Sequence, residues 1–363
     1  MPSAIEVHSQ NYYSWKTGEG AKNLRLNPNV SKPTSIPAGH VLVNIKAASL
    51  APRDAMIISG DRHYPSYIDP NGTPGSDGAG IIEKLGEGAD GKWEVGDRVI
   101  IAPTSWLKYS YEDGADAFPH VDELKTKGEK NWNGTLREYG VFPASELIPA
   151  PSYLSYPALA SLPANAGTAA HALFFGPRRL RPGQTVLAQG TGGVSVTAIQ
   201  IAAAVGATVI ATSSSNAKLE IARKLGATHT VNYSETPAWE DEVLRLTDGK
   251  GVDVVIEIGG SATLMQSLKA TKFNGLVCLV GFLTEPVQYD IIPSVLFTGR
   301  SIYGVRSVAQ EHVEYGVKVL AEKKIEPAVG KVFDWSEEGV GQALKTLANW
   351  EVVGKVVVKV GEE

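Results

Sequence analysis

The segment VLAQGTGGVS, residues 186–195, carries a short apolar run directly into a glycine-rich loop. Its glycines fall at positions 190, 192 and 193, as in the first part of the dinucleotide-binding pattern G-x-G-x-x-G. Residues 196–205 continue with the apolar character of a buried helix. A strand, a glycine loop and a helix in this order leave the free N–H groups of the helix N-terminus ready to bind a phosphate. The segment therefore predicts a dinucleotide-binding domain.

Ser195 stands where the pattern has its last glycine. The first glycine permits the tight turn, the second lets a pyrophosphate approach the backbone, and the third lets the helix pack closely on the strand. Serine adds only a hydroxymethyl group, which we expect a slightly wider helix–strand crossing to accommodate. A βα turn without any cofactor is the alternative interpretation. The context favours binding, and the residues that we expect to contact the dinucleotide here are Gly190, Thr191, Gly192, Gly193 and Val194.

Around this loop, short apolar strands alternate with helical patterns from residue 185 to residue 282. Continuous apolar strands between helices are typical of a parallel sheet that is covered on both faces. We therefore expect an α/β protein whose doubly wound Rossmann domain spans residues 156–299. Residues 1–155 show short strands separated by Gly, Pro and Asp. The C-terminal tail returns to this character with one helix, so we expect residues 300–363 to complete the first domain.

The end of the second strand of the Rossmann domain indicates which cofactor binds. An NAD site places an Asp or Glu there, about 20 residues after the glycine loop, to accept from the ribose 2′-hydroxyl. The stretch ATSSSNAK, which ends at Lys218, contains no acid. The hydroxyls of Ser213 and Ser214 and the ammonium of Lys218 suit a 2′-phosphate, which predicts NADP(H). A solvated turn that caps the next helix through Ser215 or Asn216 is the alternative, and both can hold together.

Length and composition exclude several classes of protein. The 363 residues suffice for two domains, and 43% hydrophobic with 20% charged residues is ordinary for a globular protein. A net charge of −5 offers no basic surface for nucleic acid or an anionic membrane. The N-terminus lacks the apolar core of a signal peptide, and the apolar stretch 198–211 is too short to span a bilayer, so we expect a cytoplasmic location. One cysteine, Cys278, allows no internal disulfide and no multi-cysteine metal site.

Segments that match one family run nearly from end to end of the chain: HVLVNIKAASLAPRD (40–54), PGSDGAGIIEKLGEGAD (74–90), GTLREYGVFP (134–143), SLPANAGTAAHALF (161–174) and GKVVVKV (354–360). With them the chain resembles the medium-chain dehydrogenase/reductase superfamily, on its zinc-independent, quinone-reductase-like branch. The resemblance implies a GroES-like catalytic domain built from both chain ends, a Rossmann domain between them, and an active site in the cleft. It also implies a homodimer, which we expect to form through the strand LVCLV (276–280).

The resemblance further implies roles for individual residues. In the quinone-reductase branch a lysine and a tyrosine hold the 2′-phosphate, and they match Lys218 and Tyr233. Lys355 matches a basic position that approaches the cofactor phosphates. The positions that face the nicotinamide match Thr168, Gly281, Phe282 and Leu283.

The positions that hold catalytic zinc in zinc-dependent relatives match Ala51, Ser76 and Ala164, none of which is a usable ligand. Many quinone-reductase relatives have an asparagine in place of Ala51, so a quinone-specific pocket does not carry over. The structural zinc lobe of those relatives matches the cysteine-free segment 104–135. We therefore expect no metal. The segment forms either a wall for an apolar substrate or a lobe over a sheet edge, and its aromatic residues include Trp106, Tyr109, Tyr111, Phe118 and Trp132.

Hydride transfer without a metal is best suited to reduction of an activated C=C bond, because the charge spreads into an enolate that a donor then protonates. Tyr64, in ISGDRHYPSY (58–67), resembles the proton-donating tyrosine of enoyl-thioester reductases. A phenol keeps its proton at neutral pH and can deliver it. Packing of the ring on Pro65 is the alternative interpretation, and His63 and Tyr67 are fallback donors.

Four other polar residues are interpreted as structural. We expect Asp54 and Asp77 to support neighbouring groups, and His171 to be a core histidine with its hydrogen bonds satisfied. Cys278 lies in an apolar strand, where a thiol is inert.

We therefore predict an NADPH-dependent, zinc-independent enzyme that reduces an activated C=C bond in an enone, quinone or enoyl substrate. A metal-free alcohol dehydrogenase or carbonyl reductase with the same cofactor is the first alternative. A nucleotide-binding protein without catalytic activity is the alternative from another class. No nucleic-acid or membrane partner is expected.

Overall fold

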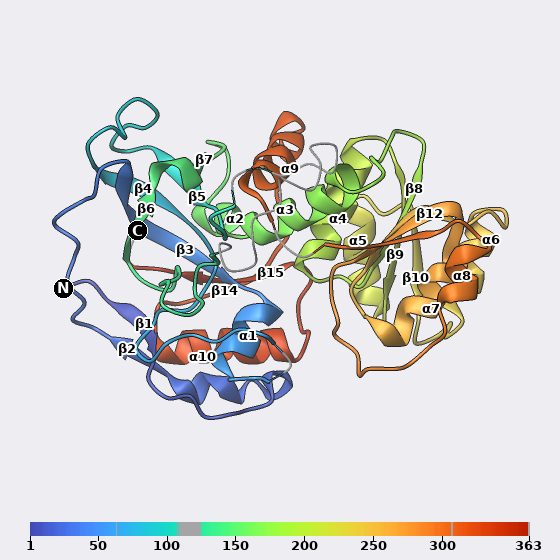
Figure 1. Cartoon of the computed structure of the whole chain (residues 1–363), viewed down its shortest axis with the longest axis horizontal. Helices are drawn as coiled ribbons and strands as arrows, with labels where there is room; N and C mark the ends of the chain where they lie inside the picture. The colour runs from blue at the N-terminus through green and yellow to red at the C-terminus, as the bar shows by residue number, and fades with distance from the viewer. Residues whose placement is uncertain (63, 107, 109–124, 306–307, 362–363) are drawn as a thin grey trace.

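The computed structural model describes residues 1–62, 64–106, 108, 125–305 and 308–361. Figure 1 shows two lobes side by side. One lobe contains both ends of the chain, and the other is built from its middle part. We call them the catalytic lobe and the Rossmann lobe.

A seven-stranded sheet forms the core of the catalytic lobe. Its strand order is β14-β15-β3-β4-β5-β7, and β6 pairs with β3. Two further strands form a separate antiparallel pair, and α1 packs against α10 beside the sheet. These elements are β1 Ala4–Val7, β2 Leu24–Asn27, β3 His40–Leu50, α1 Pro52–Ile58, β4 Asp77–Leu85, β5 Arg98–Ile101, β6 Tyr139–Pro143, β7 Leu147–Pro149, β14 Val329–Phe333, α10 Glu337–Ala348 and β15 Lys355–Lys359.

Strand β15 joins the C-terminal tail to the N-terminal part of the chain. It pairs antiparallel with β3, with Val356 opposite Leu50 and Lys359 opposite Ala47, and it pairs parallel with β14. Apolar side chains from both ends of the chain then fill one core, which includes Ile45, Val356 and Val358. Burial of this shared apolar surface holds the two ends of the chain in one lobe.

Six parallel strands form the sheet of the Rossmann lobe, in the order β10-β9-β8-β11-β12-β13. The chain moves outward from β8 through β9 and β10, then continues on the other side from β11. The switch point between β8 and β11 is where an α/β sheet opens a crevice for a ligand, beyond the carboxyl ends of the strands. The elements of this lobe are β8 Thr185–Gln189, α4 Gly193–Ala204, β9 Thr208–Ser213, α5 Asn216–Lys224, β10 His229–Asn232, α6 Trp239–Leu246, β11 Val252–Glu257, α7 Ser261–Ala270, β12 Thr271–Leu279, α8 Ile292–Leu296 and β13 Ser301–Gly304.

The central strands of this sheet are mostly apolar because helices cover both faces. Leu187, Ile210 and Val255 are fully buried in one cluster, and Val186 and Val209 in another. The predicted α/β fold with a GroES-like domain and a Rossmann domain is confirmed.

The prediction that residues 276–280 form a free sheet edge is wrong. Residues 276–279 belong to β12, which pairs with β11 on one side and with β13 on the other. The edge strand is β13, whose residues 301–304 lie beyond the expected end of the Rossmann domain at residue 299. The short run SIYG lacks a long apolar pattern, so no local pattern predicts a sixth strand.

Three helices lie between the two sheets: α2 Tyr156–Ala160, α3 Pro163–Ala170 and α9 Gln310–Glu322. Helix α3 continues into a π-helical turn, His171–Phe175, and contacts both α4 and α9. Helix α2 contacts β3 and β4 of the catalytic lobe, so this part of the chain couples the two lobes. None of the helices in the described residues is both long and apolar enough to cross a membrane.

Candidate active site

The glycine loop has the backbone geometry that the sequence predicts. Gly190 has a φ of 70°, a left-handed conformation that a residue with a side chain rarely adopts. Gly192 precedes the first residue of α4, so the loop leads straight into the helix N-terminus. The Ser195 hydroxyl, buried in the first turn, donates a hydrogen bond to the Gln189 carbonyl at 2.6 Å. The missing third glycine is therefore replaced by a bond that fastens the helix to the end of β8.

The space at the helix N-terminus fits a phosphate group. A Cβ atom added at Gly192 would meet no atom within 4 Å, whereas one added at Gly193 would meet the Asn165 side chain at 2.5 Å. The first turn of α4 carries no acidic residue, and no side chain caps it. Its N–H groups can therefore face a pyrophosphate, as in other dinucleotide sites. The loop also touches the catalytic lobe, because the Gly354 N–H donates to the Thr191 carbonyl at 3.0 Å.

A buried carboxylate at the switch point was missed by the sequence reasoning. Glu257, the last residue of β11, is fully buried and accepts hydrogen bonds from the Gln189 side chain at 2.8 Å and from the Thr263 hydroxyl at 2.6 Å. The backbone N–H groups of Gly259 and Gly260 and the Ser267 hydroxyl also donate to it. These bonds tie the end of β8 to the end of β11. The one available signal was an acid at the end of the apolar run VDVVIE.

The residues that we predicted for the 2′-phosphate lie at the end of β9, in the turn after it, on α5 and directly after β10, and Ser213 is buried. Ser214 is exposed, and the backbone N–H of Tyr233 donates to the Ser213 carbonyl at 3.1 Å. Ser215 is the N-cap of α5, as one interpretation of the sequence expected. The Lys218 ammonium donates to the Trp350 carbonyl of the catalytic lobe. This exposed bond connects α5 of the Rossmann lobe to the catalytic lobe.

One acid lies beside this turn. The Glu235 carboxylate accepts from the Asn216 side chain at 2.6 Å and from the Asn232 side chain at 3.0 Å. The two asparagine side chains also bond to each other at 2.9 Å. Glu235 follows the third strand of the domain and not the second, so the search for an acid after β9 did not include it.

The residues predicted to face the nicotinamide lie on α3 and after β12. Thr168 is half-buried on α3, and the Gly281 N–H donates to the Glu257 carbonyl at 3.2 Å. Phe282 is 53% exposed. Leu283 reaches the catalytic lobe, where it packs against the same apolar cluster as Tyr64. Leu283 and Tyr64 therefore both border the apolar core of the catalytic lobe.

Lys355 does not point to the glycine loop. Its ammonium lies 3.0 Å from an oxygen of Asp77 and donates to the Leu50 carbonyl at 3.2 Å, and the residue is buried. The predicted approach of Lys355 to the cofactor phosphates is corrected accordingly. The backbone of its neighbour Gly354 makes the contact to Thr191 instead.

The three positions that match the zinc ligands of zinc-dependent relatives are Ala51, Ser76 and Ala164. Each of them donates a hydrogen bond to a nearby aspartate. The Ala51 N–H donates to Asp54 at 2.8 Å, and the Ala164 N–H donates to Asp77 at 3.2 Å. The Ser76 hydroxyl donates to the same aspartate at 3.3 Å. Among the described residues no group of three His, Cys, Asp or Glu side chains could hold a metal ion. The side chains present here do not fit a catalytic zinc.

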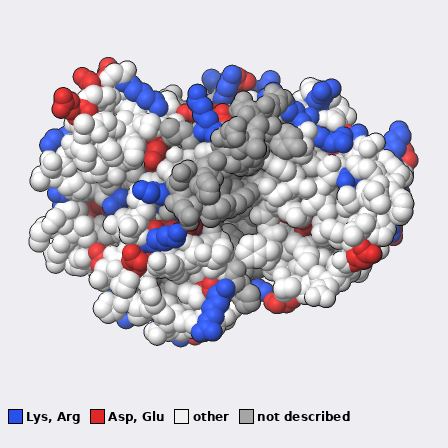
Figure 2. All heavy atoms as spheres, in the orientation of Figure 1, with Lys and Arg blue, Asp and Glu red and all other residues white. Residues whose placement is uncertain are grey.

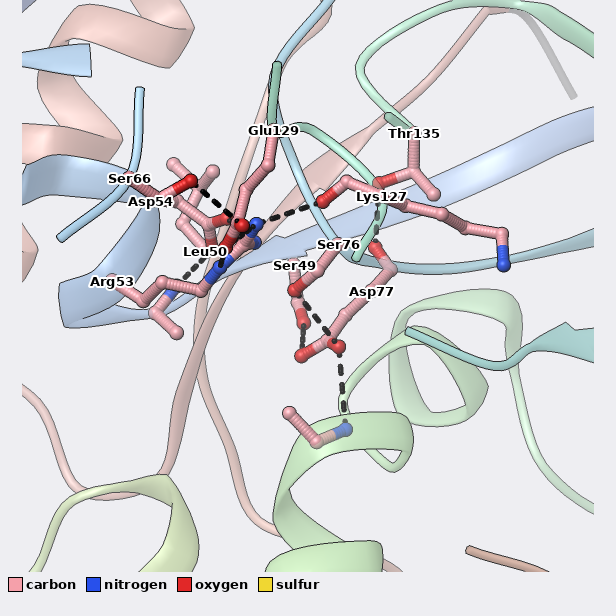
Figure 3. A network of polar contacts seen from close by, with 12 residues as sticks. Ser49, Leu50, Arg53, Asp54, Ser66, Ser76, Asp77, Lys127, Glu129 and Thr135 are labelled. Carbon is pink, nitrogen blue, oxygen red and sulfur yellow. Dashed lines mark hydrogen bonds and ion pairs between the residues drawn. The ribbon is translucent and has the colours of Figure 1, made fainter. Parts of the chain in front are cut away.

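A polar cluster next to these positions contains Tyr64. Its hydroxyl donates to the Glu129 carboxylate at 3.4 Å, and Ser66 donates to the other oxygen of Glu129 at 2.8 Å. Figure 3 shows Arg53 with its guanidinium turned toward Glu129 and Asp54. Burial raises the pKa of Tyr64 above its ordinary value, against the Arg53 charge, which lowers it. The phenol therefore holds its proton at neutral pH.

The other described residues that the sequence singles out lie outside the Tyr64 cluster or belong to the core. His171 is buried, with one ring nitrogen 2.9 Å from the Tyr303 hydroxyl, and burial raises the pKa of the Cys278 thiol to about 12. Both agree with the structural roles predicted for them. Tyr67 is 57% exposed, and the Trp132 ring lies 4.4 Å from the Lys127 ammonium. Four residues that were considered lie outside the described part of the chain: His63, Tyr109, Tyr111 and Phe118.

Comparison with family models gives two matches. Residues 37–152 match the model for the alcohol dehydrogenase GroES-like domain, and residues 193–322 match the model for zinc-binding dehydrogenases. The matches cover most of both sheets and leave out β8 of the Rossmann lobe and β14 and β15 of the catalytic lobe.

Known proteins similar to this chain include dehydrogenases and a reductase. A "zinc-type alcohol dehydrogenase-like protein" of Schizosaccharomyces pombe is 39% identical, with 90% of this chain and 93% of that protein covered. An "acryloyl-coenzyme A reductase" of Metallosphaera sedula is 28% identical, with coverage of 90% and 93%. A crystal structure of an "NAD-dependent alcohol dehydrogenase" is 29% identical and superimposes with a TM-score of 0.83 over 99% of this chain and 100% of that chain.

Proposed function

The chain belongs to the medium-chain dehydrogenase/reductase superfamily, whose members are oxidoreductases with a nicotinamide cofactor, and we propose that it reduces activated C=C bonds with NADPH and without zinc. The substrate class is an enone, a quinone or an enoyl compound. The similarity to an acryloyl-coenzyme A reductase supports this class of reaction.

One observation carries the proposal: the positions of the zinc ligands have no metal-binding side chains, and a proton donor, Tyr64, lies in the polar cluster beside them. Ala51, Ser76 and Ala164 offer no ligand set, so no Lewis acid polarises a carbonyl at this place. Tyr64 lies beside these positions with a protonated hydroxyl and a charged cluster behind it. Reduction of a C=C bond conjugated to a carbonyl needs such a donor, because the enolate carbon must gain a proton.

In this proposal, different residues bind the cofactor and supply the proton. The glycine loop and the N-terminus of α4 bind the pyrophosphate through backbone N–H groups. Ser213, Ser214, Lys218 and Tyr233 surround the 2′-phosphate. When bound, the nicotinamide supplies a hydride. Tyr64 holds at its hydroxyl the proton that the α-carbon receives.

The reaction is tested by incubating the protein with NADPH and one α,β-unsaturated ketone and then identifying the product. The proposal expects the saturated ketone, a faster reaction with NADPH than with NADH, and no dependence on added chelator. Tyr64→Phe is expected to lower kcat about 10²- to 10⁴-fold, the usual contribution of general acid catalysis. Its affinity for NADPH should stay unchanged.

An allylic alcohol as the product would overturn the proposal in favour of a carbonyl reductase or alcohol dehydrogenase. This second candidate is favoured by the names of two similar proteins, a zinc-type alcohol dehydrogenase-like protein and an NAD-dependent alcohol dehydrogenase. Loss of activity on zinc removal would contradict the metal-free mechanism for either reaction.

A further inference from the structure

Arg53 is a largely buried arginine with three polar partners. It is the second residue of α1, and its side chain is only 16% exposed. Its guanidinium lies 2.9 Å from Asp54 and 2.7 Å from Glu129, and it donates to the Lys127 carbonyl at 2.9 Å. Figure 3 shows these partners arriving from three directions. Three polar partners therefore hold the cation in place.

The cation is fixed next to the phenol of Tyr64. The hydroxyl of Tyr64 and the guanidinium of Arg53 meet at the same oxygen of Glu129, at 3.4 and 2.7 Å. Arg53 and Asp54 of α1 and Glu129 of the segment after residue 125 are the charged groups acting on this phenol in the described residues. The positive charge of Arg53 lowers the pKa of Tyr64, and the negative charge of Glu129 raises it.

These contacts matter most after Tyr64 has lost its proton. A buried phenolate without a partner is costly, because burial disfavours a charged group. A fixed guanidinium beside the oxygen offsets this cost without any rearrangement. Glu129 and Asp54 keep the guanidinium in place, so the cation cannot turn toward solvent.

We propose that Arg53 is a positioning residue that stabilises the phenolate formed when Tyr64 delivers its proton. The inference rests on the proposed function, because it takes Tyr64 as the proton donor. The O–H bond of Tyr64 breaks, and its electron pair stays on the phenolate oxygen. The proton forms the new C–H bond at the α-carbon of the enolate. A proton from water then restores the phenol, and NADPH is the only reductant required.

The test compares the pH dependence of kcat in Arg53→Gln and Glu129→Gln. Activity needs a protonated phenol, so kcat falls at high pH as Tyr64 ionises. Arg53→Gln removes the charge that favours ionisation, so the alkaline limb moves about one pH unit higher, and kcat at neutral pH falls about 10- to 100-fold. Glu129→Gln removes the charge that opposes ionisation, so the limb moves to lower pH. Arg53→Lys keeps the charge and recovers part of kcat.

Arg98 provides a matched control in the same lobe. Its guanidinium lies 4.5 Å from the ring of Tyr156 and donates to the carbonyls of Leu154 and Ser152, none of which contacts Tyr64 or Glu129 in the described residues. Arg98→Gln therefore removes a similarly engaged arginine and should leave the alkaline limb of kcat where it is in the wild type. A shift in this variant as large as in Arg53→Gln would overturn the specific role of Arg53.

A second readout does not depend on turnover. The phenolate absorbance of the wild type, minus that of Tyr64→Phe, reports the ionisation of Tyr64 alone. We expect this ionisation at a higher pH in the Arg53→Gln background and at a lower pH in the Glu129→Gln background. Unmoved titrations in folded variants would overturn the inference. If the wild type reduced no C=C substrate, the proposed function would fail. The titration would still measure how Arg53 and Glu129 affect the ionisation of Tyr64.

Discussion

At the scale of single residues, Lys218 and Glu235 bring opposite charges to the turn where the cofactor is selected. Lys218 bonds to the Trp350 carbonyl of the catalytic lobe, Ser214 is exposed, and Ser213 is buried at the end of β9. Glu235 is held by Asn216 and adds a negative charge that a 2′-phosphate disfavours. The proposed preference for NADPH therefore depends on the lysine prevailing over the acid.

We expect Lys218→Ala to raise the Kd for NADPH about 10- to 100-fold, as for loss of a charge-assisted hydrogen bond, and to leave the Kd for NADH almost unchanged. Glu235→Gln should act in the opposite direction and tighten NADPH alone. Calorimetric titration of each variant with both cofactors measures the four constants. An equal rise in the Kd for NADH and for NADPH in Lys218→Ala would show that the lysine supports the fold and does not bind the 2′-phosphate.

The outcome for individual residues shows what a local pattern can predict. The cap by Ser215, the left-handed Gly190 and the burial of Cys278 follow from neighbours in the chain, and the structure has all three. The bond of Ser195 to Gln189 explains how a serine replaces a glycine, but only the curvature of the loop brings the two groups together. Lys355 was misplaced because its partner, Asp77, comes from a strand far away in the sequence.

At the scale of elements, a buried ion pair attaches the segment that begins at residue 125 to the catalytic lobe. The side chain of Lys127 is fully buried, with its ammonium 2.7 Å from Glu146 and 4.4 Å from the Trp132 ring. Burial lowers the pKa of Lys127, although Glu146 partly opposes this effect. Its backbone N–H donates to the Pro103 carbonyl at 2.9 Å, so the residue closes the segment onto the sheet. Glu129, which holds Arg53, is only two residues further along.

Glu146→Gln is expected to lower the free energy of unfolding by about 3–5 kcal/mol, because it leaves the buried ammonium without its counter-charge. It should also weaken the hold on Glu129 and so reduce kcat. Urea unfolding measures the first effect and steady-state kinetics the second. The exposed pair of Lys22 and Glu19 is the control, and Glu19→Gln should leave stability unchanged within error. Similar stability of the two variants would mean that the buried pair does not fasten the segment.

Elements with a long repeating pattern were predictable, and short or remote ones were not. The five-strand alternation from β8 to β12 reads directly from apolar runs and helical spacing, because each unit buries its own faces. Strand β13 has four residues and takes its place from β12, so no local pattern marks it. The network around Glu257 joins three elements at once and appears only when the sheet is assembled.

At the scale of the whole molecule, a few polar contacts cross between the lobes. Gly354 donates to Thr191 at 3.0 Å, Lys16 pairs with Glu285 at 2.8 Å, and Lys218 bonds to Trp350. All three lie at the glycine loop, the segment after β12 or the cofactor turn. We therefore expect the binding of a dinucleotide at these places to depend on the relative position of the lobes. Figure 2 shows acidic and basic groups mixed over the visible face, in keeping with the small net charge.

The outer edge of the Rossmann lobe carries apolar side chains that no described residue covers. Phe273 is 69% exposed, Ile292 66%, Leu296 67% and Phe297 77%. They belong to the start of β12 and to α8 and its end, next to the edge strand β13. A free strand edge beside exposed apolar groups is typical of an interface. We propose that a second copy of the chain covers this edge, with β13 in the place that the sequence assigned to residues 276–280.

We expect the wild type to have about twice the monomer mass of 38.6 kDa in light scattering. Leu296→Glu and Phe297→Glu should each produce a monomer, because a desolvated carboxylate inside an apolar interface is strongly unfavourable. Val95, which is 62% exposed in the catalytic lobe, supplies the control, and Val95→Glu should leave the mass unchanged. A β-edge interface lies away from the crevice, so the monomeric variants should still bind NADPH. A wild type that is monomeric at micromolar concentration would refute the dimer, and a dimer that survives both substitutions would place the interface on another surface.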